Sequence, residues 1–156
     1  MATYFSNAFT PKDGYWRRVR GYWQHVWNSP PWAWHGIDWG LKTGSKVYAT
    51  HSAIVSKVVL NDYYAGNNIL LQVTATTGKP INMYLWYAHL SKVYVKNGQR
   101  LKGGALIGLS GATGKVSGPH LHFSWLVRIV GVLRPRDPEN RKAIVWRGKW
   151  PPNFPY

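Results

Sequence analysis

The sequence of 156 residues contains no cysteine, so neither disulfide bonds nor thiolate metal ligands are available to it. Any metal must therefore be held by histidine, aspartate or glutamate side chains. The sequence also lacks any run that approaches the roughly 20 apolar residues of a membrane-spanning helix. Its length is that of one domain, which can bury a hydrophobic core without covalent cross-links.

Acidic residues are scarce as well. Five Asp and Glu stand against twenty Lys and Arg, which gives a formal net charge of +15 at pH 7. Such a charge favours anionic partners, namely nucleic acid, anionic lipid or an acidic polymer of the bacterial wall. The ten Trp and ten Tyr residues suit stacking on nucleic-acid bases, and they suit sugar rings equally well. Composition alone does not choose among these partners.

The two ends of the chain differ in composition from its middle. Residues 1–33 are rich in Trp and Arg and predict an irregular arm or lid with one short helix around residues 15–27. No basic-then-apolar stretch typical of a signal peptide occurs in residues 1–10. Residues 139–156 form a Pro-rich basic tail that we expect to run over the surface.

Residues 34–138 have the pattern of a β protein. Short segments rich in Val, Ile, Tyr and Thr are separated by turn signals such as Asn97-Gly98. The strand candidates are residues 46–59, 68–75, 82–90, 105–110 and 120–134. Because no helical pattern intervenes, we expect an antiparallel all-β sheet or sandwich.

The strongest local motif is Gly-Pro-His-Leu-His-Phe at residues 118–123. Alternate residues of a strand point to the same face, so His120 and His122 would lie side by side while Leu121 and Phe123 face a core. One imidazole could then bind a metal while the other reaches the metal-bound water or the substrate. Taken alone, the pair is equally consistent with structural or surface histidines.

Two further motifs carry polar residues in apolar surroundings. Residues 86–91, Trp-Tyr-Ala-His-Leu-Ser, place His89 at the end of an aromatic strand, where a lone histidine is more often a packed or capping residue. Residues 34–39, Trp-His-Gly-Ile-Asp-Trp, place His35 near Asp38. Burying Asp38 unpaired would be costly unless a cation or metal compensates, and the plainer alternative is an aspartate that caps a turn.

The order of these three motifs resembles the M23 zinc metallopeptidases of the lysostaphin/LytM type. Residues 44–49, 95–104 and 107–114 resemble the family's intervening stretches, so the resemblance covers about residues 34–138. It implies an antiparallel β-sheet with a groove across it and one zinc ion per chain. It also implies an endopeptidase that cuts a peptide bond in the stem or cross-bridge of peptidoglycan.

Carried over residue by residue, the resemblance makes Asp38 and His122 zinc ligands. It makes His89 and His120 the catalytic pair, which does not bind the metal. This pair would activate the water and stabilise the oxyanion. Three protein ligands would leave the fourth position of zinc open for that water.

The first motif departs from the family pattern of His, three residues and Asp. Trp34 stands in the position of the histidine, and an indole cannot ligate zinc. We expect the adjacent His35 to be the third ligand. Replacement of this ligand by His25 or another residue, and loss of zinc altogether, are the alternatives.

The sequence therefore predicts a peptidoglycan hydrolase that its basic surface attracts to anionic wall polymers. We expect a bacteriophage protein, either a lysin in the host cytoplasm before lysis or a component of the virion tail that contacts other tail proteins. The alternative is a catalytically inactive M23-like module that binds cell wall or a structural partner. A nucleic-acid-binding protein would leave the ordered His and Asp motifs unexplained.

Overall fold

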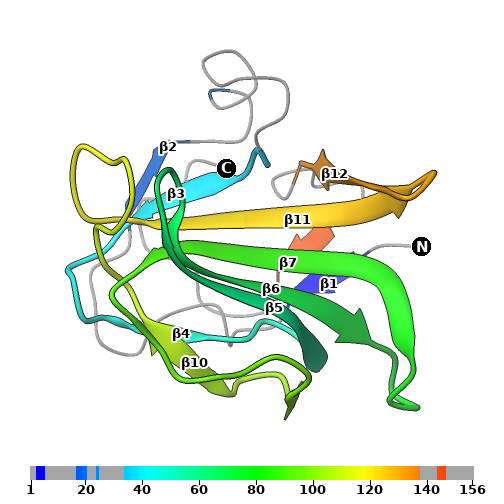
Figure 1. Ribbon diagram of the computed structural model, residues 1–156. Coiled ribbons are helices and arrows are strands. Elements are labelled where there is room, and N and C mark those ends of the chain that lie inside the picture. The colour runs from blue at the N-terminus through cyan, green and yellow to red at the C-terminus, as the bar shows by residue number, and fades with distance from the viewer. Residues whose placement is uncertain (1–2, 6–16, 21–23, 25–33, 138–143, 147–156) are drawn as a thin grey trace.

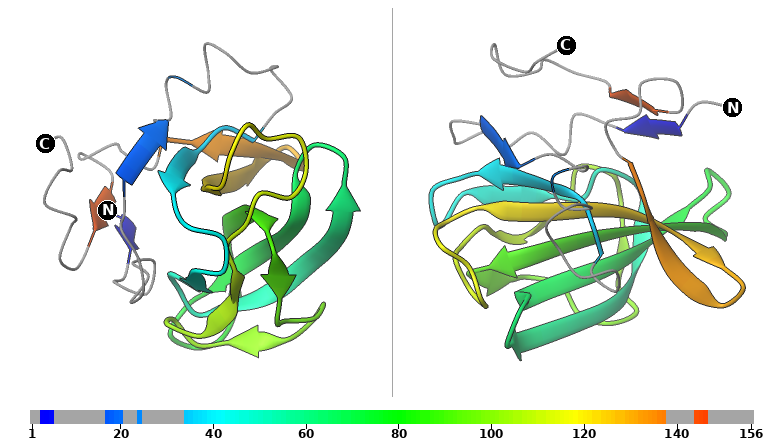
Figure 2. Two further views of the ribbon diagram at one scale, coloured as in Figure 1. Left: turned by 90° about the vertical axis from the view of Figure 1, so that its left-hand side faces the viewer. Right: turned by 90° about the horizontal axis from the view of Figure 1, so that it is seen from above.

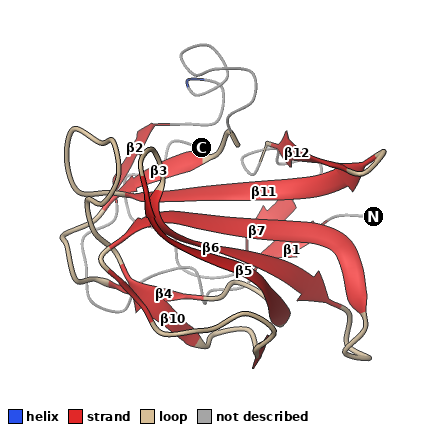
Figure 3. Ribbon diagram, viewed as in Figure 1, coloured by secondary structure: helices blue, strands red, loops and turns tan. Residues whose placement is uncertain are grey.

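Strands account for the regular structure of this protein, as its β-branched and aromatic segments predict. A computed structural model describes residues 3–5, 17–20, 24, 34–137 and 144–146 (Figure 1). Figure 3 shows strands joined by loops over residues 34–137. Among the same residues, no helix is long and apolar enough to cross a membrane.

The largest sheet has eight strands, and all its pairings are antiparallel. In spatial order its strands are β2 (Arg17–Arg20), β3 (Ile37–Gly40), β11 (Leu121–Ile129), β7 (Pro80–Leu90), β6 (Gly66–Thr74), β5 (Ala53–Asp62) and β9 (Arg100–Leu101), with β12 (Val132–Arg136) paired to β11. The sheet is strongly twisted and curled (Figure 2). The predicted antiparallel all-β fold is therefore confirmed.

Two smaller sheets complete the described structure. The strands β4 (Lys46–Tyr48), β10 (Leu106–Leu109) and β8 (Lys92–Val93) form an antiparallel sheet, and β1 (Thr3–Phe5) pairs in parallel with β13 (Ile144–Trp146). One hydrophobic cluster joins the largest sheet to the β4–β10–β8 sheet, because Val47 and Ile107 of the latter pack with core residues such as Leu71 of the former.

The strand candidates differ from the observed strands where a turn lies inside a candidate. Residues 46–59 divide into β4 and β5, and residues 120–134 divide into β11 and β12. The second division occurs at Val130 and Gly131, whose φ angles of 49° and 76° belong to a tight two-residue hairpin turn. Val130 gives no sequence signal for such a turn, because asparagine or glycine is usual there.

The N-terminal arm takes part in the largest sheet. Residues 17–20 form β2, which pairs with β3, so the short helix expected around 15–27 is wrong at these residues. Cross-strand pairing with β3 overrides the local propensity there. Most of the remaining arm, and the tail at 139–156 apart from β13, lies outside the described residues.

Candidate active site

Strands β3, β11 and β7 position the candidate site at one end of the largest sheet. His122 is the cross-strand partner of Asp38 on one side and of Ala88 on the other. Directly opposed residues share a face of a sheet, so Asp38 and His122 project to the same side. Leu121 and Phe123 are fully buried in the core on the other side, as the alternation of the motif predicts.

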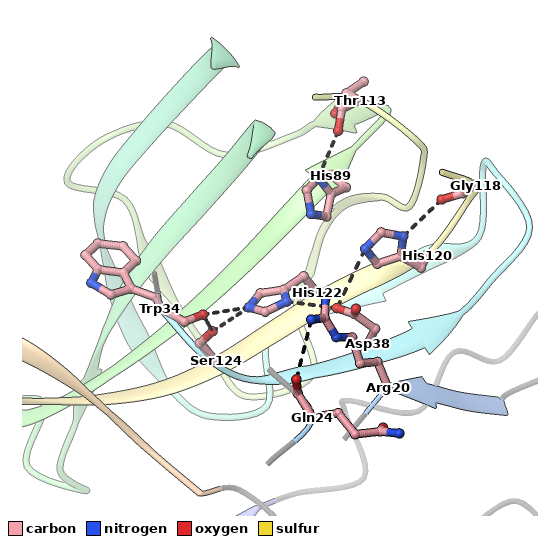
Figure 4. Close-up of polar contacts among 10 residues, drawn as sticks. All are labelled: Arg20, Gln24, Trp34, Asp38, His89, Thr113, Gly118, His120, His122 and Ser124. Atoms are coloured by element: carbon pink, nitrogen blue, oxygen red, sulfur yellow. Dashed lines mark hydrogen bonds and ion pairs between the residues drawn. The ribbon is translucent and has the colours of Figure 1, made fainter. Parts of the chain in front are cut away.

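Three histidines and one aspartate meet on this face (Figure 4). His122 Nδ1 lies 2.8 Å from Asp38 Oδ1, and His120 Nε2 lies 3.6 Å from the same oxygen. The His89 ring centroid is 4.6 Å from that of His120 and 6.3 Å from that of His122. Asp38 and His122 are both buried. The structure thus brings together four of the five predicted site residues, which come from three separate motifs.

A bulge in β7 aims His89 at the site. Ile69 of β6 pairs with Tyr87, whereas Asn67 pairs with Leu90, so β7 has one extra residue at Ala88 and His89. His89 has a φ of 64°, a left-handed conformation that is uncommon outside glycine. Such strain is typical of functional sites and costs about 1–3 kcal/mol. Without the bulge, strict alternation would turn His89 away from the face that holds His122.

Each histidine ring is held by a backbone carbonyl. His89 Nδ1 lies 2.9 Å from Thr113 O, and His120 Nδ1 lies 2.9 Å from Gly118 O. A carbonyl oxygen only accepts hydrogen bonds, so both rings donate from Nδ1. When these rings are neutral, each Nε2 therefore carries a lone pair. This leaves Nε2 as the proton-accepting atom of both rings.

The ring of His122 carries its proton on Nε2 instead of Nδ1. His122 Nε2 lies 2.8 Å from Trp34 O and 2.8 Å from the hydroxyl of Ser124. The Ser124 hydroxyl itself donates to Trp34 O at 2.8 Å. It can therefore only accept from His122, whose proton lies on Nε2. The lone pair of the neutral ring is consequently on Nδ1, and it faces the Asp38 carboxylate.

Sequence reasoning had assigned no role to Ser124 or to the carbonyl of Trp34. A close approach of the backbone makes their contact with His122 possible. A Cβ atom on Gly36 would lie 2.0 Å from Phe123 O, so only glycine allows this segment to pack against β11. The Trp34 side chain points away to an edge-to-face contact with Trp86, with ring centroids 5.0 Å apart.

Burial and neighbouring charge keep His89 neutral. Desolvation by burial, and then repulsion from a charge on His120, lower the pKa of His89 from 6.5 to about 4. A charge on His122 acts in the same direction, while the Thr113 carbonyl and Asp38 partly oppose the shift. His89 is therefore uncharged at neutral pH.

The pair formed by Asp38 and His122 fits a cation. A lone pair on His122 Nδ1 and a carboxylate oxygen 2.8 Å away repel each other unless a proton or a metal ion lies between them. Both atoms are good zinc ligands. His35 is buried, but the described part of the chain contains no group of three or more His, Cys, Asp or Glu side chains arranged to hold a metal. The role of His35 as third ligand stays a prediction, and His25 lies outside the described residues.

Strand β2 adds a positive group to the site. Arg20 is the cross-strand partner of Asp38, and Figure 4 shows its side chain extending toward the site. Its guanidinium donates to Gln24 O at 3.5 Å. The sequence had shown only a cluster of arginines in the arm, because pairing between β2 and β3 could not be foreseen.

A carboxylate and an imidazole that share one cation position, beside two further imidazoles, are typical of metallopeptidase sites. Residues 33–133 match Peptidase family M23. The match covers more than half of the 156 residues, and the chain therefore belongs to this family.

Relatives and solved structures agree with this assignment. The chain is 41% identical over 95 residues to the peptidoglycan DD-endopeptidase ShyA of Vibrio cholerae. It is 35% identical over 104 residues to lysostaphin of Staphylococcus simulans. The matches cover 60% and 67% of this chain but 20% of each relative, so the chain spans about a fifth of their length.

Two solved structures have a similar fold. The catalytic domain of lysostaphin from Staphylococcus simulans has a TM-score of 0.58 and 31% identity, with 85% of this chain and 90% of that chain covered. A zinc containing peptidase from Vibrio cholerae has a TM-score of 0.63 and 29% identity, with 85% of this chain and 39% of that chain covered.

Proposed function

We propose that this chain is a zinc-dependent endopeptidase that cleaves peptide bonds in the stem or cross-bridge of bacterial peptidoglycan. The observation that carries the proposal is that three carbonyl-anchored histidines gather on one face of the sheet, two of them within 3.6 Å of Asp38. Membership of family M23 supports it. So do a relative named as a peptidoglycan DD-endopeptidase and a structural neighbour described as zinc containing.

Asp38 and His122 would hold the metal, with His35 as the expected third ligand. Zinc bound there supplies Lewis-acid activation of water and of the scissile carbonyl. Ser124 and the Trp34 carbonyl hold His122 in the tautomer that directs Nδ1 toward Asp38. Partners of this kind raise the affinity of a site for its metal.

His120 and His89 move the protons of the reaction. The Nδ1 proton of each ring is held by a carbonyl, so Nε2 accepts a proton from the attacking water and returns it to the leaving amine. Once protonated, the same Nε2–H donates to the developing oxyanion. A positive charge on His120 lowers the pKa of His89, so one ring holds the transferred proton while the other stays neutral.

The net charge of +15 supports attraction to anionic wall polymers at low and moderate ionic strength. The expected bacteriophage context, as a lysin or as a tail component that contacts other tail proteins, stays a prediction.

A catalytically inactive module of the same family is the second candidate. The observation that favours it is that the described residues do not assemble a group of three metal-binding side chains. Such a module would bind cell wall or a structural partner through the same face of the sheet.

Elemental analysis combined with hydrolysis of purified sacculi separates the two candidates. For the peptidase we expect zinc near one per chain, and we expect Asp38→Ala and His122→Ala each to lose both zinc and activity. His35→Ala should lose zinc if His35 is the third ligand. Absence of zinc after reconstitution, together with intact wall binding, would establish the inactive module.

A further inference from the structure

An exposed aromatic pair lies at the β5–β6 turn, beside the candidate active site. Tyr63 and Tyr64 are 70% and 55% exposed. Their rings are perpendicular, with an interplanar angle of 89° and centroids 4.8 Å apart. Lys115 Nζ lies 5.9 Å from the centre of the Tyr64 ring. We call these three side chains the tyrosine platform.

The backbone of this turn is held by several hydrogen bonds. Asp62 Oδ1 accepts from the backbone N–H groups of Tyr64 at 2.9 Å and of Ala65 at 2.7 Å. Asn61, which has a φ of 59°, donates its backbone N–H to Asn67 Oδ1 at 3.0 Å. The edge-to-face contact between the two rings is worth about 0.5–1.5 kcal/mol beyond its buried area. The backbone that carries the platform is therefore held in place before any ligand arrives, which lowers the entropic cost of binding.

The same turn is hydrogen-bonded directly to His89 and to the loop that follows β10. Ala65 O accepts the backbone N–H of His89 at 2.9 Å, and Tyr64 O accepts that of Lys115 at 3.0 Å. A Cβ atom on Gly114 would lie 2.4 Å from Tyr64 O, so the turn packs closely on the loop at 111–119. That loop carries Thr113, whose carbonyl holds the His89 ring. In Figure 1 both loops lie at the end of the sheet where β7 ends and β11 begins.

The shape and chemistry of the platform fit a sugar ring. Pyranose rings present faces of C–H groups, which are weakly positive, and the face of an aromatic ring is negative. Two perpendicular tyrosines offer such a ring one aromatic face and one aromatic edge. Lys115 supplies a positive charge for the carboxylates of attached stem peptides.

From these contacts we infer that the tyrosine platform is a binding site for the amino-sugar rings of the glycan strand. It holds that strand while an attached peptide reaches His89 and His120. The inference rests on the proposed function, since it gives the same site a second part of the same substrate. Aromatic side chains on a rigid turn also bind single-stranded nucleic acid by base stacking, so an oligonucleotide belongs in the test.

The test is a titration of the full chain with a peptide-free tetrasaccharide of alternating N-acetylglucosamine and N-acetylmuramic acid. We expect Tyr63→Ala and Tyr64→Ala each to weaken the Kd by about fivefold or more, the lower end of what one stacked ring contributes. Tyr94 is 50% exposed, and its backbone N–H donates to Ile107 O of the β4–β10–β8 sheet. The matched control Tyr94→Ala should leave the Kd unchanged.

Substitution of an exposed tyrosine should leave the fold intact, which circular dichroism checks. Tyr63→Leu and Tyr64→Leu replace any variant that unfolds. The inference is overturned if the wild-type chain does not bind the tetrasaccharide, if the tyrosine variants bind it as tightly as the wild type, or if an oligothymidine binds more tightly with the same dependence on the tyrosines.

Hydrolysis of sacculi is measured separately, so the two proposals can fail independently. Tyrosine-dependent glycan binding without hydrolysis would remove the proposed peptidase function but keep the platform as a glycan site. Hydrolysis of sacculi without tyrosine-dependent glycan binding would keep the proposed peptidase function but remove the platform as a glycan site.

Discussion

The ring nitrogen Nε2 of His122 lies 2.8 Å from the backbone carbonyl oxygen of Trp34. This contact places the proton of the neutral ring on Nε2 and the lone pair on Nδ1, toward Asp38. Trp34 thus contributes to the site through its backbone, by orienting the histidine of another motif.

Removal of the Ser124 hydroxyl should weaken metal binding. Ser124 is fully buried, and its hydroxyl contacts both His122 Nε2 and Trp34 O. We expect Ser124→Ala to lower zinc affinity by about tenfold or more, as loss of such a partner does elsewhere, and to lower the free energy of unfolding by about 1 kcal/mol. Competition with a chelator measures the first effect and urea unfolding the second.

Ser124→Thr is the matched control because it keeps the hydroxyl. Its zinc affinity should stay close to that of the wild type. The ¹⁵N shifts of His122 in the metal-free chain report the tautomer directly, and a proton on Nδ1 instead of Nε2 would contradict the assignment.

Loss of either uncoordinated imidazole should reduce turnover while zinc is retained. We expect His120→Ala and His89→Asn each to reduce kcat by about 10²–10⁴-fold, the usual contribution of a general acid or base. Asparagine suits the second position because it tolerates the left-handed φ of His89. Zinc content and hydrolysis of sacculi are measured on the same preparations.

His51 provides the control for these two substitutions. Its Nδ1 lies 2.8 Å from the hydroxyl of Thr50, and the site geometry does not involve it. His51→Ala should keep wild-type turnover. Wild-type turnover in both His120→Ala and His89→Asn would show that the proton-transfer roles are wrong.

The lowered pKa of His89 makes the metal-free fold sensitive to acid. Because the folded-state pKa is about 4 and the ordinary value is 6.5, the unfolded chain binds the proton first as the pH falls. Stability is therefore unaffected by His89 above about pH 6.5 and decreases as the pH falls from there toward 4.

Urea unfolding in the presence of a chelator at pH 7.5 and pH 5 tests this linkage. The wild type should lose more stability between the two pH values than His89→Asn, which has no titrating group at this position. Equal losses in both proteins would mean that His89 is not held neutral by its burial.

Restoring a histidine at position 34 tests whether the metal site has lost a ligand. The Trp34 indole packs edge-to-face on Trp86, so Trp34→His should cost about 1–3 kcal/mol of stability through lost aromatic burial. Because His35 is the expected third ligand, zinc affinity should stay close to the wild-type value. A rise of about tenfold or more would contradict the role of His35 and make position 34 a vacated ligand position.

The sequence alone predicted the features that depend on alternation and order. His120 and His122 share a face, and Leu121 and Phe123 enter the core, because the period of a strand is two. The sequence also predicted an antiparallel all-β fold, because its closely spaced strand segments have no helical pattern between them. These features are local, so they can be read from neighbouring residues.

Tertiary structure decided the features that depend on contacts between distant segments. The bulge that aims His89 arises from the register of β7 against β6. The contacts of the Trp34 carbonyl with His122 and Ser124 require β11 to lie against the segment around Gly36. The position of the tyrosine pair beside the site follows from its packing on the loop at 111–119. None of these features has a signature in the local sequence, because each joins segments that the fold alone brings together.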